Sequence, residues 1–122
     1  MRPKILVVDD SKTVRIIVRK ALEAFACDVN EATNGFNGLF AMEKERPDLI
    51  LLDVSMPIMG GVEMLTLLKS HPQLQKIPVI MMTSPSDHQV IPKIIDLGVG
   101  DRIMKPFAAD VLVKAIRRIL TF

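Results

Sequence analysis

The fold is decided near the start of the chain by the stretch ILVVDDS, residues 5–11, in which four apolar residues run directly into two adjacent aspartates. Three similar apolar runs follow at residues 49–52, 79–82 and 103–104, and none of them alternates apolar with polar side chains. Continuous apolar runs are typical of strands that are covered on both faces, as in a parallel sheet between layers of helices. A weaker strand is expected at residues 28–32, where the side chains do alternate.

Helical periodicity fills the segments between these runs. In residues 12–25, apolar side chains recur on one helix face, charged side chains occupy the other faces, and Ser11 is a suitable N-cap. Further helices are expected at about residues 35–45 and 62–69, within residues 87–97, and around residues 112–119. In the first helix the apolar set is Val14, Val18, Ala21, Leu22 and Phe25, and the charged set is Lys12, Arg15, Arg19 and Glu23.

The alternation of five strands with five helices predicts the fold class. Short connections between such elements give βα units with right-handed crossovers, and hence an α/β protein with a five-stranded parallel sheet in a doubly wound (βα)5 sandwich. A chain of 122 residues has the usual length of one domain, and it contains no linker, repeat or low-complexity stretch. We therefore expect a single domain over residues 1–122.

Composition and charge argue against several classes of function. The formal net charge is +2 and like charges do not gather in blocks, so direct nucleic-acid binding is not expected. No apolar run approaches the roughly 20 residues that a membrane-spanning helix needs, and the apolar run near the start is too short for a signal peptide. The single cysteine, Cys27, has no partner for an internal disulfide. A cytoplasmic protein without membrane insertion is expected.

Polar side chains stand at the ends of the four apolar runs. Asp9 and Asp10 follow the first run, Asp53 the second, Thr83 the third and Lys105 the fourth. The carboxyl ends of parallel strands meet at one edge of the sheet, where ligands of such folds bind. Crowded carboxylates repel one another unless a cation intervenes, and a hard cation with oxygen ligands, such as Mg²⁺, suits them. A nucleophile, a metal and a lysine at one edge form the arrangement that phosphoryl transfer needs.

Each of these residues has an ordinary interpretation when it is taken alone. An aspartate after a strand is usually a turn residue or a helix cap. A lone lysine at a strand end is usually a solvated side chain, and a lone threonine there is usually only a strand-end hydroxyl. The conjunction of all of them at four strand ends favours the functional interpretation.

The same stretches carry a resemblance to a known family. Over essentially its whole length the chain resembles the response-regulator receiver domains of two-component signalling, which have a CheY-like (flavodoxin-like) fold. The matching segments are VVDDS at residues 7–11, DVSMP at 53–57 with Gly61, MTS at 82–84 and MKPF at 104–107.

This resemblance implies a phosphoacceptor and a metal site. Asp53 would accept a phosphoryl group from the phosphohistidine of a sensor histidine kinase or phosphotransfer protein, or from a small acyl phosphate. Asp10, Asp53 and the backbone carbonyl of Ser55 would bind Mg²⁺ directly, and Asp9 would act through water.

The resemblance also implies how the phosphoryl group is read. Lys105 would pair with the phosphoryl oxygens, Thr83 would donate its hydroxyl to them, and the peptide between Lys105 and Pro106 would be cis. Such a protein is a signalling switch and not a turnover enzyme, because it only phosphorylates and dephosphorylates itself.

Two residues depart from the family pattern. Arg102 stands three positions before Lys105, where the family usually has an aromatic residue. Its guanidinium should stay outward, or swing inward only towards a carboxylate, because an unpaired buried charge is costly. Pro92 lacks a backbone N–H, so the fourth helix should begin late, near Ile91, or be kinked, with residues 85–90 loosely ordered. The surface around Arg102 is basic, which favours an acidic downstream protein target, although an ordinary solvated face explains the same charges.

Other functions compete with the switch. A pseudo-receiver that keeps the fold but never accepts phosphate would explain Arg102 and Pro92, yet the intact set of acidic residues, threonine and lysine argues against it. A haloacid-dehalogenase-type phosphotransferase needs a second aspartate two positions after Asp53, where Ser55 stands. Nucleotide binding is not indicated, because neither glycine-rich phosphate-binding motif occurs.

Overall fold

The computed structural model describes residues 2–122, which form five strands, five α-helices and one 3₁₀ helix. The elements follow one another as β1 (Lys4–Val8), α1 (Lys12–Leu22), β2 (Asp28–Ala32), α2 (Gly35–Lys44), β3 (Leu49–Asp53), α3 (Gly61–Ser70), β4 (Val79–Thr83), η1 (Pro85–Val90), α4 (Ile91–Asp96), β5 (Arg102–Met104) and α5 (Ala109–Arg117).

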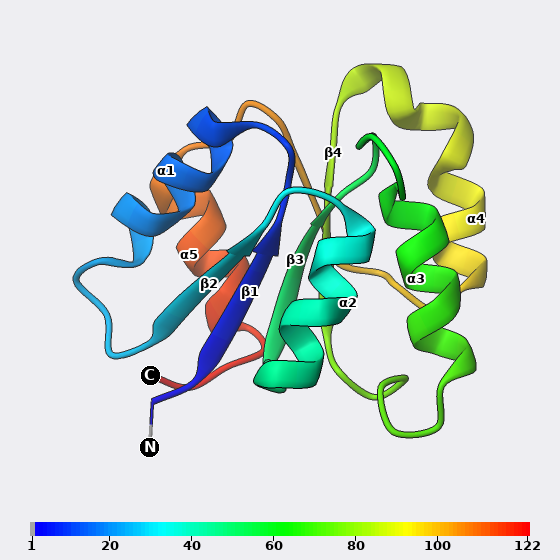
Figure 1. Cartoon of the computed structure of the whole chain (residues 1–122). Helices are drawn as coiled ribbons and strands as arrows, with labels where there is room; N and C mark the ends of the chain where they lie inside the picture. The colour runs from blue at the N-terminus through cyan, green and yellow to red at the C-terminus, as the bar shows by residue number, and fades with distance from the viewer. Residues whose placement is uncertain (1) are drawn as a thin grey trace.

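The strands form one parallel sheet in the order β2-β1-β3-β4-β5. Figure 1 shows α1 and α5 on one side of this sheet and α2, α3 and α4 on the other. The expected fold class is therefore confirmed. Its order is that of a doubly wound sheet, in which the direction of the strand order reverses beside β1.

The continuous apolar runs follow from this layering. Along β1, Leu6 and Val8 pack into the layer of α2, α3 and α4, whereas Ile5 and Val7 pack into the layer of α1 and α5. All five residues of β3 are buried, so a strand in this position has no face for polar side chains. The edge strand β2 is largely exposed, which is why its sequence alternates.

The first helix begins as the sequence predicts, with the Ser11 hydroxyl accepting a hydrogen bond of 3.3 Å from the Val14 backbone N–H. It ends at Leu22, so Phe25 lies beyond the helix on which the periodicity placed it. Phe25 still packs into the same layer, and its ring centroid lies 5.4 Å from that of Phe122. The apolar spacing therefore identified the buried face correctly but not the end of the helix.

The fourth helix begins late, as the position of Pro92 predicts. Helix α4 starts at Ile91, so the missing N–H of Pro92 falls in the first turn, where no helical partner exists for it. The preceding segment differs from the expected loose loop, because residues Pro85–Val90 form a 3₁₀ helix. Asp87 stabilises its start by accepting a 2.7 Å hydrogen bond from the backbone N–H of Ser84.

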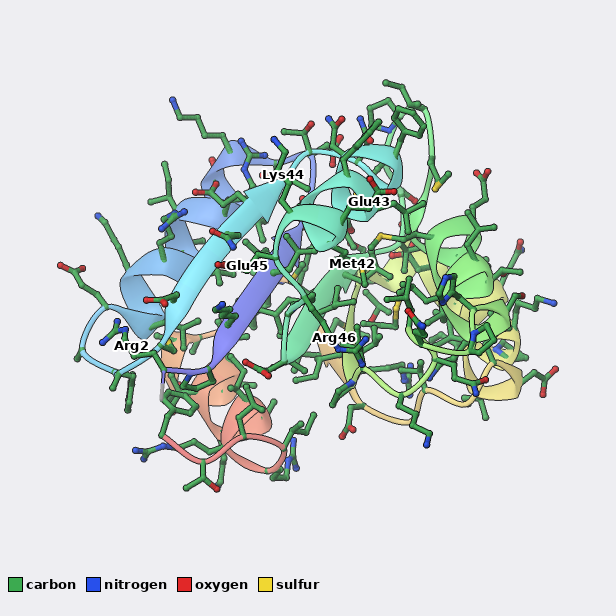
Figure 2. All side chains as sticks on the ribbon, turned by 60° about the horizontal axis from the view of Figure 1, so that its bottom comes forward. Arg2, Met42, Glu43, Lys44, Glu45 and Arg46 are labelled. Carbon is green, nitrogen blue, oxygen red and sulfur yellow. The ribbon has the colours of Figure 1, made fainter. Side chains whose placement is uncertain are left out.

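The amino-terminal edge of the sheet comes forward in Figure 2, where Arg2 and the end of α2 are labelled. Two cations at this edge form exposed ion pairs: Arg2 pairs with Asp28 at 2.8 Å and Lys4 with Glu45 at 3.2 Å. Such exposed pairs contribute little to the stability of the fold. Among residues 2–122, no helix is both long enough and apolar enough to cross a bilayer.

Candidate functional site

Three carboxylates meet at the carboxyl edge of the sheet, beside the reversal of strand order. Asp9 and Asp10 follow β1, and Asp53 is the last residue of β3; one oxygen from each lies within 4.8 Å of the others. Asp9 is fully buried, Asp53 is 5% exposed, and Asp10 is exposed. Residues 43 positions or more apart in the sequence are thus brought together, because β1 and β3 are neighbours in the sheet.

Lys105 reaches this cluster from the connection between β5 and α5. Its Nζ donates a 2.9 Å hydrogen bond to Oδ1 of Asp53 and lies 2.6 Å from Oδ2 of Asp9. That buried Asp9 oxygen makes no well-aligned hydrogen bond within residues 2–122, despite the nearby ammonium. A buried carboxylate oxygen left in this way, beside two further carboxylates, is suited to an additional cation.

The electrostatics of the cluster follow from burial. The pKa of Asp53 is raised to about 6, chiefly by burial and also by the neighbouring carboxylates Asp9 and Asp10, although the hydrogen bond from Lys105 acts to lower it. Burial alone would lower the pKa of Lys105, but its hydrogen bond to Asp53 and the negative charges of Asp53 and Asp9 outweigh this effect and raise that pKa. At neutral pH, Asp53 is therefore ionised although its burial disfavours the charge, and it lies beside the charged Lys105.

Main-chain bonds hold the two buried carboxylates in place. The Asp9 Oδ1 accepts a 2.8 Å bond from the backbone N–H of Ser11, and Asp53 Oδ1 accepts a 2.9 Å bond from that of Val54. Gly61 closes the loop after β3, and its N–H donates to the Val54 carbonyl at 2.8 Å. A Cβ on Gly61 would lie 1.9 Å from the Asp53 carbonyl oxygen, so only glycine fits there.

Thr83 and Ser55 lie at the same edge without joining the cluster of bonded groups. Thr83 ends β4 and is 1% exposed, and its hydroxyl has only a long 3.5 Å contact with the Ile103 carbonyl. Ser55 is exposed in the loop that follows Asp53. The peptide between Lys105 and Pro106 is cis, as the resemblance implied. The Arg102 side chain is exposed on β5, as expected from the cost of burying its charge.

Sequence reasoning missed one residue of this site. Arg15 was assigned to an outer face of the first helix, yet its side chain is only 14% exposed and its Nη1 donates a 2.8 Å hydrogen bond to the Asp9 carbonyl oxygen. The acceptor is a main-chain carbonyl, which every residue carries. No spacing rule in the sequence points to such a contact.

Comparisons with known proteins agree with this geometry. Residues 5–117 match the family described as the response regulator receiver domain. Sporulation initiation phosphotransferase F of Bacillus subtilis is 35% identical over 120 residues, which cover 98% of this chain and 95% of that protein. The phosphate regulon transcriptional regulatory protein PhoB of Rhizobium meliloti is 28% identical over 98% of this chain, which spans only 53% of that protein's length.

A solved structure points to the same family. The chemotaxis response regulator CheY4 of Vibrio cholerae is 30% identical and superposes with a TM-score of 0.89, covering 98% of this chain and 100% of that one. Family match, relatives and fold thus agree with the cluster of aspartates and lysine at the sheet edge. This chain belongs to the response regulator receiver family, whose members are phosphoacceptor switches of two-component signalling.

Proposed function

We propose that Asp53 is the residue that accepts the phosphoryl group, in a Mg²⁺-dependent transfer from the phosphohistidine of a sensor histidine kinase or phosphotransfer protein. The observation that carries this proposal is the position of Asp53, a buried carboxylate within 4.8 Å of two further carboxylates and 2.9 Å from a lysine. The chain itself then catalyses only its own phosphorylation and dephosphorylation. It acts in the cytoplasm, where the free thiol of Cys27 stays reduced.

The donor set supports Mg²⁺ rather than a softer metal, because oxygen atoms alone converge here. Asp10, Asp53 and the backbone carbonyl of Ser55 are the direct ligands in this proposal, and Asp9 acts through water. Bound Mg²⁺ supplies positive charge to the oxygens of the transferring phosphoryl group.

The chain's own residues complete the transfer. A carboxylate oxygen of Asp53 forms a bond to phosphorus as the bond from phosphorus to the donor nitrogen or oxygen breaks. The Lys105 ammonium, now bonded to Asp53, turns to the new phosphoryl oxygens. The hydroxyl of Thr83, held by only a 3.5 Å contact, is available to donate to the same oxygens. The change at these two residues is the signal that the fold passes on.

The phosphorylation signal reaches a partner protein at the surface that carries Arg102. Its exposed basic residues include Lys93 on α4 and Arg102 on β5, and neither takes part in an ion pair within the described chain. Unpaired positive charge on adjacent elements favours an acidic partner. We therefore assign the docking of the downstream protein target to this surface.

Incubation with acetyl phosphate and Mg²⁺, followed by intact mass spectrometry, tests the proposal. A gain of about 80 Da is expected, the mass of one phosphoryl group, with no gain in EDTA or in Asp53→Asn. The variant Asp48→Asn, which alters an exposed aspartate at the opposite edge, serves as the matched control and should label normally. A protein that gains no mass under these conditions would be a pseudo-receiver instead.

A further inference from the structure

The side chain of Arg15 connects three parts of the chain. It leaves α1, and its Nη1 donates a 2.8 Å hydrogen bond to the carbonyl oxygen of Asp9, at the end of β1. Its Nε donates a bond of the same length to Oε1 of Glu31, on β2. Because the guanidinium is planar and rigid, a bond at Nε fixes the direction in which Nη1 points.

The Glu31 end of this connection is itself anchored. Arg19, one turn further along α1, also pairs with Glu31, and its Nη2 donates a 2.9 Å bond to the Val29 carbonyl. The hydrogen bond from Arg19, together with that from Arg15, lowers the pKa of Glu31 despite the opposing effect of burial. Glu31 is therefore an ionised anchor on β2 that holds the Arg15 guanidinium against Asp9.

The Asp9 end is fixed from three directions. Its backbone N–H donates to the Ala32 carbonyl at 3.0 Å, its Oδ1 accepts from the Ser11 N–H at 2.8 Å, and its carbonyl accepts from Arg15. That carbonyl belongs to the planar peptide group that joins Asp9 to Asp10. The bond from Arg15 consequently sets the plane from which the Asp10 side chain departs.

Asp10 needs such support because its side chain has none of its own. It is exposed, and no hydrogen bond or ion pair within residues 2–122 involves its carboxylate. Its oxygen nevertheless lies within 4.8 Å of those of Asp9 and Asp53. Its placement therefore depends on the main chain, and at this peptide the main chain is held by Arg15.

We propose that Arg15 is a positioning residue of the acceptor site, which orients the peptide between Asp9 and Asp10 so that the carboxylates stand ready for the metal. The inference rests on the proposed function, because it assumes that these carboxylates bind Mg²⁺. Groups that orient metal ligands in this way commonly change metal affinity by an order of magnitude without touching the metal.

The test compares Mg²⁺ affinity in Arg15→Ala and Arg19→Ala. Both variants remove an arginine bound to Glu31, but only the first removes the bond to Asp9. The chain has no Trp or Tyr, so isothermal titration calorimetry is the suitable method. We expect the dissociation constant for Mg²⁺ to rise about tenfold in Arg15→Ala and to stay within about twofold of wild type in Arg19→Ala.

Phosphorylation by acetyl phosphate provides a second readout. Arg15→Ala should need correspondingly more Mg²⁺ for half-maximal labelling, yet reach nearly the wild-type rate when Mg²⁺ saturates. A loss of maximal rate without a change in the Mg²⁺ requirement would overturn the inference. Arg15→Lys keeps the charge but lacks the planar fork, so its affinity should fall between those of wild type and Arg15→Ala.

Three further results would overturn the inference, either alone or together with the proposed function. Unchanged Mg²⁺ affinity in Arg15→Ala, or equal losses in Arg15→Ala and Arg19→Ala, would overturn the inference alone. If Arg15→Ala does not fold, as judged by circular dichroism, Arg15→Lys carries the comparison with Arg19→Ala, and equal affinities in those two would overturn it. A folded wild-type protein that binds no Mg²⁺ would contradict the proposed function and this inference together.

Discussion

Replacing Asp53 by asparagine should stabilise the metal-free protein at neutral pH. Burial raises the pKa of Asp53 to about 6 from its ordinary value of 3.8, so the ionised carboxylate is less favourable in the fold than in the unfolded chain. An interval of about two pH units corresponds to ~3 kcal/mol of unfolding free energy. Asparagine keeps the shape of the side chain and removes the charge.

The raised pKa of Asp53 determines how the stability difference between Asp53→Asn and the wild type changes with pH. Between pH 3.8 and about 6 the unfolded chain releases this proton while the folded chain keeps it, so wild-type stability falls across that window as the pH rises. The advantage of Asp53→Asn should therefore be ~3 kcal/mol at about pH 7.5 and under ~1 kcal/mol at about pH 4. Added Mg²⁺ should narrow the gap by stabilising the wild type more than the variant.

Urea denaturation in EDTA, followed by far-ultraviolet circular dichroism, measures this difference. At about pH 7.5 the midpoint of Asp53→Asn should lie roughly 1–3 M urea above that of the wild type. Asp101→Asn, at an exposed position, is the matched control and should shift neither midpoint. The electrostatic reasoning would be refuted if Asp53→Asn were no more stable than the wild type at about pH 7.5. It would also be refuted if the stability advantage of the variant were the same at about pH 7.5 and about pH 4.

Three further substitutions test the packing and charge of the site. Gly61→Ala places a methyl group 1.9 Å from the Asp53 carbonyl oxygen and should lower the free energy of unfolding by about 2–3 kcal/mol. Gly100→Ala has open space around it and should change that free energy by no more than ~0.5 kcal/mol, so equal losses of the two variants in thermal melts would contradict the prediction. Ile58 adopts a left-handed backbone with φ 70° and is 82% exposed, so Ile58→Asn should gain ~1 kcal/mol in the same melts, and a loss would count against the strain. Lys105→Met leaves two buried carboxylates without their cation and should cost ~3 kcal/mol at neutral pH in EDTA, with recovery at about pH 4; a loss that does not depend on pH would point to packing instead.

The parts of the fold that depend on burial could be predicted from the sequence. A strand such as β3 reads as a continuous apolar run because helices cover both of its faces, and β2 reads as an alternating one because it lies at the edge. The late start of α4 followed from the missing N–H of Pro92. The convergence of Asp9 and Asp53 followed from the rule that parallel strands present their carboxyl ends together.

The parts that depend on particular hydrogen bonds could not be predicted. The 3₁₀ helix before α4 is stabilised at its start by the hydrogen bond from the Ser84 N–H to Asp87. The apolar pattern of the sequence does not distinguish this 3₁₀ helix from a loop or from a further turn of α4. The end of α1 at Leu22 could not be read from an apolar pattern that runs on to Phe25. The contact of Arg15 with a main-chain carbonyl leaves no trace in the pattern of residue types.

The identity of the phosphoacceptor is tested most directly by locating the phosphoryl group. After labelling with acetyl phosphate and Mg²⁺, borohydride reduction converts a phosphorylated aspartate to homoserine, and peptide mass spectrometry then identifies its position. Homoserine at position 53 alone is the expected result, because Asp53 is the carboxylate that ends β3 with a lysine at 2.9 Å. Homoserine at Asp9 or Asp10, or a protein that labels without forming homoserine at position 53, would contradict the proposed acceptor.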